Sequence, residues 1–149
     1  MTIKQKIYDH YLAVLNQKIK ALQNVLADLK DSGSNETKST AGDKHETALA
    51  MLQIEQANVG AQLNDLLQKK AVMEKINPGF SSPSIINGSL VKTDHGYFFI
   101  SIASGRAVIE GVTVTALSSQ SPLGGSLMGL YAGSTAHLNN KSYVIETVY

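Results

Sequence analysis

The sequence predicts an α+β protein: an N-terminal antiparallel α-helical hairpin of coiled-coil type, followed by a small antiparallel β-sheet domain with one short helix. The first observation behind this prediction is a difference in composition between two parts of the chain. Residues 1–76 hold ten lysines, nine acidic residues, three glycines and no proline. Residues 77–149 hold only six charged residues but nine glycines and all three prolines. The second observation is the spacing of apolar residues, which follows the helical period in the first segment and alternates as in a strand in the second.

The overall composition excludes several classes of protein. With 149 residues, 43% hydrophobic and 17% charged, the chain can form one compact domain or two small ones and is not generally disordered. Its net charge of +1 predicts weak or no independent binding to nucleic acids. The absence of cysteine excludes disulfides, thiolate metal sites and cysteine nucleophiles. No stretch approaches the ~20 apolar residues of a membrane helix, so we expect a cytoplasmic protein with no membrane partner.

Two heptad-like seams predict two long helices that pack against each other. Spacings of three and four residues give each helix a narrow apolar stripe, which is the pattern of a coiled coil. The second seam is less regular because it includes three polar residues. The first seam consists of Tyr8, Leu12, Leu15, Ile19, Leu22, Leu26 and Leu29, and the second of His45, Leu49, Leu52, Gln56, Val59, Leu63, Leu66, Lys70 and Met73.

The segment between the seams, residues 31–42, is rich in turn-forming residues and has no large apolar side chain. This composition predicts that the helices pair within one chain, as an antiparallel hairpin of residues 1–76 with its tip around residues 31–46. With about 28 residues in each arm and ~1.5 Å per residue, such a hairpin projects on the order of 40 Å. The alternative is a coiled coil between two chains that only dimerises the protein.

A linker and short strands follow the hairpin. Pro78 and Pro83 cannot continue a helix, so residues 77–85 are expected to form an irregular connector before a domain of residues 86–149. In that domain we predict a hairpin turning at residues 94–96, further strand material over residues 108–117, and a last hairpin turning at residues 139–140. One short helix interrupts the strands, with Ser121 as its N-cap, Pro122 at its first position and residues 123–128 as its body.

Two motifs resemble those of a known family. Residues 41–48, Ala-Gly-Asp-Lys-His-Glu-Thr-Ala, are similar to the Gly-Asp-Leu-x-Glu-Asn-Ala stretch at the coiled-coil tip of the bacterial Gre transcript-cleavage factors. Residues 119–133, Ser-Gln-Ser-Pro-Leu-Gly-Gly-Ser-Leu-Met-Gly-Leu-Tyr-Ala-Gly, are similar to the Ser-Ser-Pro-Ile-x-x-x-Leu-x-Gly-x-x-x-Gly signature of their C-terminal, FKBP-like domain. The motifs occur in the same order, and the resemblance spans nearly the whole chain. The sequence departs from the family pattern at Lys44, Thr47, Leu130 and Ser134, so it resembles a divergent member.

The resemblance implies a function at RNA polymerase. Gre factors dock their globular domain on the rim of the polymerase's secondary channel and insert the hairpin, so that tip carboxylates reach the active centre near the 3′ end of the nascent RNA. The polymerase then hydrolyses the RNA, so the factor is not an enzyme by itself. It has no cofactor of its own, because the Mg²⁺ ion is shared with the polymerase. The partner-binding residues implied in the globular domain are Ser121, Pro122, Leu123, Leu127 and Gly129.

Asp43 and Glu46 are the tip residues that the resemblance implies, as catalytic carboxylates that assist the polymerase and as ligands of the shared Mg²⁺. Mg²⁺ prefers oxygen ligands, and helical positions three residues apart share a face. The partial positive charge of a helix N-terminus also favours ionised acids there. A purely structural explanation stays open, because Asp43 and Glu46 have the spacing of a capping box, as do Thr40 and Asp43. Glu36 in the loop is a further candidate carboxylate.

The remaining patterns carry weaker signals. Ser126 lies in a glycine-rich stretch like that of a serine nucleophile, but Met128 occupies the position of the expected glycine, which favours helix packing. The histidines lack metal-ligand spacing, and only His45 lies near the tip. The lysines of the first arm and loop can face nucleic acid or an acidic channel wall, or can simply solvate a helix. These are Lys4, Lys6, Lys18, Lys20, Lys30, Lys38 and Lys44.

Three functions stay open at the level of the sequence. The first is a Gre-like elongation factor that stimulates cleavage of backtracked RNA. The second is a non-cleaving regulator or inhibitor that enters the same channel, which the altered tip residues favour. The third treats the C-terminal domain as an FKBP-like prolyl isomerase or chaperone, which needs an aromatic-lined apolar cleft that a chain without tryptophan forms poorly.

Overall fold

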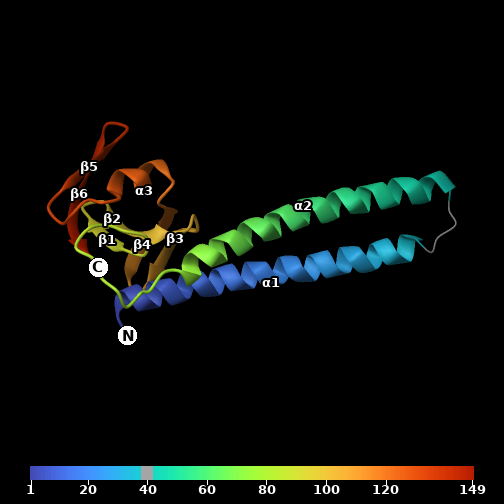
Figure 1. Ribbon diagram of the computed structural model, residues 1–149, viewed down its shortest axis with the longest axis horizontal. Helices are drawn as coiled ribbons and strands as arrows, with labels where there is room; N and C mark the ends of the chain where they lie inside the picture. The colour runs from blue at the N-terminus through green and yellow to red at the C-terminus, as the bar shows by residue number, and fades with distance from the viewer. Residues whose placement is uncertain (38–41) are drawn as a thin grey trace. The chain divides into compact units, whose positions relative to one another are not determined.

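The computed structural model describes the backbone of residues 1–37 and 42–149, and the side chains of residues 1–33 and 46–149. Two long helices precede a six-stranded sheet with one short helix, which confirms the α+β fold class (Figure 1). The elements are α1 (Ile3–Thr37), α2 (Gly42–Glu74), β1 (Leu90–Thr93), β2 (Gly96–Ser101), β3 (Gly105–Ile109), β4 (Val112–Ser118), α3 (Pro122–Leu127), β5 (Thr135–Leu138) and β6 (Lys141–Val148).

The chain forms two compact units. The first, here called the sheet unit, combines Met1–Ala13 with Ala71–Tyr149, and the second, the helical unit, is Val14–Lys70. Composition changes at residues 76 and 77, whereas the packing divides the chain within both long helices. The sheet unit is therefore discontinuous in sequence, because the first turns of α1 belong to it. Within the residues that the structure describes, no helix combines the length and hydrophobicity needed to cross a membrane.

In the helical unit, α1 and α2 of one chain pack antiparallel along the two predicted seams. Every described seam position between Val14 and Lys70 is buried or half-buried, and Leu15, Ile19 and Val59 are the most deeply buried at 3–5% exposure. Pairing within one chain therefore accounts for the seams, as the hairpin prediction requires. The side chain of His45 lies outside the described residues.

A polar member of the second seam is explained by its contact with α1. The side-chain Nε2 of Gln56 donates a hydrogen bond to the backbone oxygen of Leu29, 3.1 Å away. A Cβ at Gly33, one helical turn after Leu29, would lie at an ordinary contact distance of 3.4 Å from Gln56 Nε2. Gln56 thus satisfies its amide inside the seam and helps to fix the register of the two helices.

The sheet has the strand order β3-β4-β2-β1-β6-β5. All neighbouring strands are antiparallel except β2 and β4, which pair in parallel from Tyr97 opposite Val114 to Ser101 opposite Ser118. The strand material predicted over residues 108–117 belongs to two strands, because Glu110 and Gly111 form a two-residue turn between β3 and β4. Both have a positive φ, 53° and 75°, which is the conformation of a type I′ hairpin turn. The chain returns through β3 at the edge before β4, so β4 runs in the same direction as β2.

The other predicted hairpins are present. Asp94 and His95 connect β1 to β2, and Asn139 and Asn140, with φ values of 52° and 63°, connect β5 to β6. Residues 77–85 form no helix or strand, apart from an isolated bridge between Ser84 and Tyr131. The connector is anchored by backbone hydrogen bonds from Ile85 N to Leu130 O and from Gly129 N to Ile85 O.

The core of the sheet unit lies on both faces of the sheet. On one face α3 packs against the strands, and Ile100, Leu127 and Ile145 are fully buried there. On the other face the ring of Tyr11 stacks on Phe99, with centroids 6.3 Å apart and planes at 25°. The Tyr11 hydroxyl lies 2.8 Å from Gly105 O and 3.2 Å from Val114 O, either of which can accept its hydrogen bond.

The first turns of α1 bury a stripe that the seam prediction missed. Tyr8 and Leu12 are only half-buried, whereas Lys4, Ile7 and Tyr11 are buried. The side chain of Lys4 does not solvate the helix, because its Nζ donates hydrogen bonds to Phe80 O (2.6 Å) and Tyr149 O (3.1 Å). Its burial lowers its pKa from the usual value of 10.5. This ammonium joins α1, the connector and the chain after β6.

Candidate functional site

The helix α3 begins as the sequence predicts, at a serine cap followed by proline. Ser121 Oγ accepts a hydrogen bond from Gly124 N at 3.1 Å, and the same hydroxyl donates to Ser118 O at 2.6 Å. Pro122 takes the first helical position, where its missing N–H costs nothing. The cap therefore fixes the direction in which the chain leaves β4 and enters α3.

Gly124 makes this close return of the chain possible. A Cβ at Gly124 would collide with the backbone oxygen of Ser118, the same oxygen that accepts the Ser121 hydroxyl. A Cβ at the neighbouring Gly125 would meet only Ser119 O at an ordinary distance of 3.7 Å. The helix opening is thus specified by Ser121, Pro122 and Gly124 together.

The residues implied as partner-binding differ in what they offer to a partner. Pro122 and Gly129 are exposed, and Ser121 and Leu123 are half-buried. Leu127 is fully buried in the core, so it can support the site only by holding α3 in place. Gly129, in the turn that follows α3 and its C-cap Met128, has a φ of 80°, a conformation that favours glycine. The exposed part of the site is therefore the helix opening and the turn after the helix.

The tip carboxylates belong to the helical unit. Helix α2 begins at Gly42, so Asp43 is in its first turn, where the partial positive charge of the helix favours an acid. Glu46 follows three residues later and its side chain is exposed. The side chains of Asp43, Lys44 and Glu36 lie outside the described residues, as does Thr40 altogether, so the capping interactions of Thr40 and Asp43 stay predictions.

The two acids can supply only part of a metal coordination shell. Asp43 and Glu46 offer carboxylate oxygens from neighbouring positions of one helix, which suits Mg²⁺, but Mg²⁺ binds six ligands in total. No cluster of three or more histidine, cysteine or acidic residues occurs among the residues that the structure describes. Any Mg²⁺ held at this helix end would need its remaining ligands from water or from a partner.

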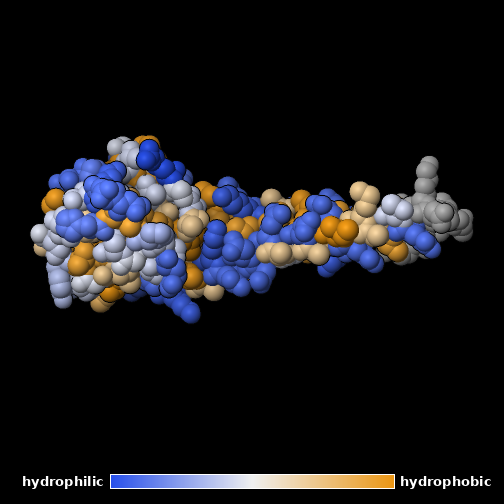
Figure 2. All heavy atoms as spheres, turned by 90° about the horizontal axis from the view of Figure 1, so that it is seen from above, coloured by the Kyte–Doolittle hydropathy of each residue, from blue (hydrophilic) through white to orange (hydrophobic). Residues whose placement is uncertain are grey.

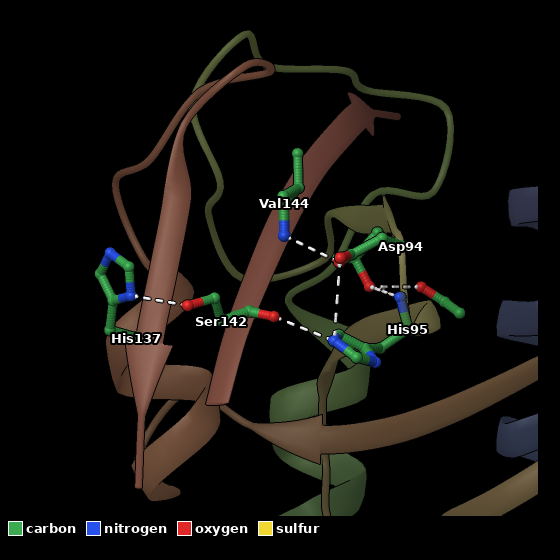
Figure 3. Close-up of polar contacts among 7 residues, drawn as sticks. Asp94, His95, His137, Ser142 and Val144 are labelled. Carbon is green, nitrogen blue, oxygen red and sulfur yellow. Dashed lines mark hydrogen bonds and ion pairs between the residues drawn. The ribbon is translucent and has the colours of Figure 1, made fainter. Parts of the chain in front are cut away.

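Two other sequence patterns have local structural explanations. Ser126 Oγ donates a hydrogen bond to Leu123 O at 2.7 Å inside α3, so Ser126 is part of a helix and not of a strained nucleophile turn. His137 Nδ1 lies 3.0 Å from Ser142 Oγ across the last hairpin, where both side chains are exposed (Figure 3). Neither serine is part of a triad within the described residues.

The turn between β1 and β2 is fastened to β6 by side chains. Asp94 Oδ1 accepts a hydrogen bond from Val144 N at 2.8 Å, and His95 Nε2 lies 2.9 Å from Ser142 O (Figure 3). The register between β1 and β6 shifts next to this turn, between Lys92 and Thr93. Asp94 thus bonds to β6 through its side chain and through its backbone N, which lies 3.2 Å from Val144 O. The ring of His95 lies edge to face on Tyr143, with centroids 5.0 Å apart.

The structure adds a concave site that the sequence did not indicate, here called the basic cleft. It has a volume of about 420 Å³ and lies on the sheet face that α3 covers. Arg106 is the only arginine of the chain, and this is the one signal by which the sequence could have pointed to the site. The cleft is lined by His95, Gly96, Tyr97, Phe98, Arg106, Thr113, Thr115, Leu123, Lys141 and Tyr143.

Among known proteins, the matches to this chain are a small set of solved structures. No protein-family model and no curated protein matches the chain. The crystal structure of GreA factor homolog 1 (Gfh1) of Thermus thermophilus is similar at 14% identity and a TM-score of 0.38, over 93% of this chain and 94% of that one. A structure of the transcription factor Gfh1 is similar at 14% identity and a TM-score of 0.36, over 93% and 92% of the two chains. Gfh1 of Thermus aquaticus is similar at 16% identity and a TM-score of 0.31, over 99% and 94%. The identities and TM-scores of these three matches are low.

Proposed function

We propose that this chain is a Gre-like transcription factor that binds RNA polymerase and stimulates the polymerase to cleave backtracked RNA. The observation that carries the proposal is the pair of motifs and their structural settings. The Gly-Asp-x-x-Glu motif opens the second helix of an antiparallel pair, and the Ser-Pro motif caps a short helix on a β-sheet. Each motif thus has the local structure that the resemblance to Gre factors implies.

The helical unit supports the delivery of carboxylates into a narrow channel. Within this unit α1 runs from Val14 to Thr37 and α2 from Gly42 to Lys70, so the helices extend about 36 Å and about 43 Å at ~1.5 Å per residue. Glu46 is exposed near the start of α2, and Asp43 precedes it by less than one turn. In the proposed complex Asp43 and Glu46 share a Mg²⁺ ion with the polymerase near the 3′ end of the RNA. That ion, when bound, would activate a water molecule for hydrolysis. Asp43 and Glu46 would hold the ion and orient the water.

The sheet unit supplies the proposed docking surface. Pro122 and Gly129 are exposed at the two ends of α3, next to half-buried Ser121 and Leu123. The Ser121 cap and buried Leu127 keep this surface rigid, which reduces the entropy lost on binding. In this proposal the polymerase is the enzyme, and the chain needs no cofactor in its free state.

A cleavage assay on backtracked elongation complexes tests the proposal. The full chain is added to stalled complexes made with RNA polymerase of the same organism, and the rate of RNA shortening is measured. We expect an increase of at least about 10-fold, lost in the Asp43→Ala/Glu46→Ala double variant, because each carboxylate contributes to metal and water orientation. Glu55→Ala is the matched control, since Glu55 is an exposed acid of the same helix. An unchanged rate with the wild-type chain contradicts the cleavage function.

Docking is tested separately by binding to core polymerase. Pro122→Ala is expected to weaken binding about 10-fold, because Pro122 is exposed and its loss leaves the Ser121 cap in place. Gln120→Ala, at an exposed residue of the preceding loop, serves as the control. Equal binding of the wild-type and Pro122→Ala chains would remove α3 from the docking surface.

A second candidate is a regulator that enters the channel without stimulating cleavage. Lys44 and Thr47 favour it, since they replace the leucine and asparagine of the Gre tip motif next to the two acids. In this case the chain binds polymerase and slows transcription, and the Asp43→Ala/Glu46→Ala variant keeps that effect. The same double variant therefore separates the two candidates.

A further inference from the structure

The basic cleft of the sheet unit has an excess of positive charge. Arg106 and Lys141 line it, and neither forms an ion pair with any residue that the structure describes. His95 also lines it, and its Nε2 lies 3.8 Å from the carboxylate of Asp94. No acidic side chain lines the cleft. Two cations without acidic partners around one cavity favour an anionic ligand.

The strand register fixes where the arginine stands. Arg106 on the edge strand β3 is opposite Thr115 on β4, and Thr115 is in turn opposite Phe98 on β2. These three residues form one row across the sheet on the face that α3 covers. A guanidinium presented from a regular strand can bind a phosphate through two parallel hydrogen bonds, and the hydroxyl of Thr115 adds a further donor beside it.

The lysine is held at the opposite side of the cleft by an aromatic ring. Lys141 Nζ lies 5.3 Å from the centroid of Tyr143, within the range of a cation–π interaction. Tyr143 packs edge to face on Phe98, with centroids 5.9 Å apart and planes at 76°. Phe98 and Tyr143 are each 8% exposed, so they present only a small apolar surface at the bottom of the cleft. Leu123 of α3 extends this apolar floor.

The size and lining of the cleft indicate the class of ligand. About 420 Å³ lies in the range of small-molecule sites, ~300–1,000 Å³. The lining joins an apolar, aromatic floor with cationic and hydroxyl groups at the rim, so the ligand needs a flat apolar part and an anionic part. A nucleoside phosphate has both, whereas an acidic peptide segment offers anionic groups without a flat apolar part.

We propose that the basic cleft binds a nucleoside phosphate. Its phosphate lies between Arg106 and Lys141, its hydroxyls face Thr113 and Thr115, and one edge of its base contacts the parts of Phe98, Tyr143 and Leu123 that line the cleft. This inference goes beyond the proposed function, because it needs neither RNA polymerase nor the carboxylates of the helical unit.

Titration of the full chain with adenosine 5′-monophosphate tests the proposal, followed through the backbone amide signals in NMR spectra. We expect saturable shifts at Arg106, Thr115 and Lys141, and an affinity at least about 10-fold higher than for adenosine or inorganic phosphate, since each of these lacks one half of the recognised group. Binding should weaken as salt is raised, because it depends on accessible charges.

Variants locate the binding. Arg106→Gln and Lys141→Gln should each weaken binding by about 5- to 10-fold, and the double variant more strongly, because a charge-assisted hydrogen bond is lost each time. Lys92→Gln is the matched control, since Lys92 is opposite Tyr97 on the other face of the sheet and pairs with Glu146 at 3.9 Å. Arg106→Lys keeps the charge but not the planar fork, so its affinity should fall between those of the wild type and Arg106→Gln. Circular dichroism melting confirms that each variant is folded.

Three results would overturn the proposal. The first is the absence of saturable shifts with the nucleotide. The second is unchanged affinity in the Arg106→Gln/Lys141→Gln double variant. The third is displacement of the nucleotide by a glutamate-rich hexapeptide that binds more tightly, which would make the cleft a site for an acidic protein segment. None of these results depends on the outcome of the polymerase assays.

Discussion

Among single residues, Gly124 has the strictest steric requirement in the sheet unit. Gly124→Ala would force a Cβ into the backbone oxygen of Ser118, so we expect a loss of at least about 2–3 kcal/mol in the free energy of unfolding. Gly125→Ala, one position later, meets only an ordinary contact and should stay within about 1 kcal/mol of the wild type. Urea unfolding of the two variants measures the difference, and equal stabilities would contradict the close approach.

The hydroxyl of Tyr11 links α1 to β3 and β4. Tyr11→Phe removes the donor that reaches Gly105 O or Val114 O, and we expect a loss of about 1 kcal/mol near pH 7. Tyr97→Phe is the control, because the Tyr97 hydroxyl makes no hydrogen bond within the described residues. Urea unfolding at neutral pH tests this, and a Tyr11→Phe chain as stable as the wild type would argue against a contribution from the bond.

The same tyrosine gives the stability of the sheet unit an alkaline limit. Burial raises the pKa of Tyr11 above its usual 10.0, so the folded state keeps the phenol proton where the unfolded state loses it. Its contribution is complete below about pH 10 and is lost as the pH rises through the folded-state pKa. The wild type should therefore lose stability above pH 10 faster than Tyr11→Phe, and parallel pH profiles would contradict this.

Lys4 predicts the opposite dependence on pH. Its lowered pKa means that the unfolded state binds the proton more tightly, so the wild type gains stability as the pH rises from the folded-state pKa toward 10.5. The Lys4→Met chain has no group at this position that titrates in that pH range. Both chains keep Tyr11 and its pH dependence, so the tyrosine cancels in the comparison. The difference in unfolding free energy between wild type and Lys4→Met should thus grow in favour of the wild type from neutral to alkaline pH. A constant difference would mean that the ammonium is not desolvated in the folded state.

At the scale of elements, the helical unit depends on a narrow seam. Figure 2 shows apolar residues at its surface among polar ones, and Met51 and Ile54 are more than 60% exposed. Val59→Ala, at a seam residue with 4% exposure, should lower the stability of the helical pair by about 2 kcal/mol. Ile54→Ala removes a larger side chain from the exposed face and should change it by less than about 0.5 kcal/mol. Helical circular dichroism in urea compares them, and similar losses would argue against the seam.

The elements also show what the sequence could and could not predict. The seams, the Ser121 cap and the turn at Asn139 and Asn140 follow from local spacing and turn chemistry, and the structure contains them. The buried stripe of Ile7 and Tyr11 has the same helical period as the seam beside it, so periodicity alone could not choose between them. The turn at Glu110 was missed because glutamate rarely takes a positive φ, and with it the parallel pairing of β2 and β4.

The candidate sites differ in the same way. The opening of α3 is encoded by neighbouring residues, so the sequence located it. The basic cleft joins Arg106, Phe98 and Lys141 from three strands, and only the register of the sheet brings them together. Pairing between strands that are distant in the chain produces no local sequence pattern, so the cleft could not be predicted from the sequence.

For the molecule as a whole, the discontinuous sheet unit means that residues 77–149 are not a complete folding unit. Without Met1–Ala13 the sheet loses the stacking of Tyr11 on Phe99. It also loses the hydrogen bonds from Lys4 to Phe80 O and Tyr149 O. A fragment of residues 77–149 should therefore be less stable than the full sheet unit by several kcal/mol. Replacing residues 14–70 by a short flexible linker keeps all of these contacts and should restore cooperative unfolding, which thermal melting can compare. Equal melting of the two shortened chains would show that the first turns of α1 are dispensable.

The bonds of Lys4 have a consequence for how the protein matures on the ribosome. The amine that closes the sheet unit is translated well before one of its acceptors, Tyr149 O, which is 145 positions later. The apolar face of the first turns must therefore stay uncovered until β6 has been synthesised and has left the exit tunnel. Contacts so distant in sequence form slowly, since their loop-closure entropy is lost before any packing is gained. During this interval the nascent chain depends on chaperones, or on speed, to avoid aggregation.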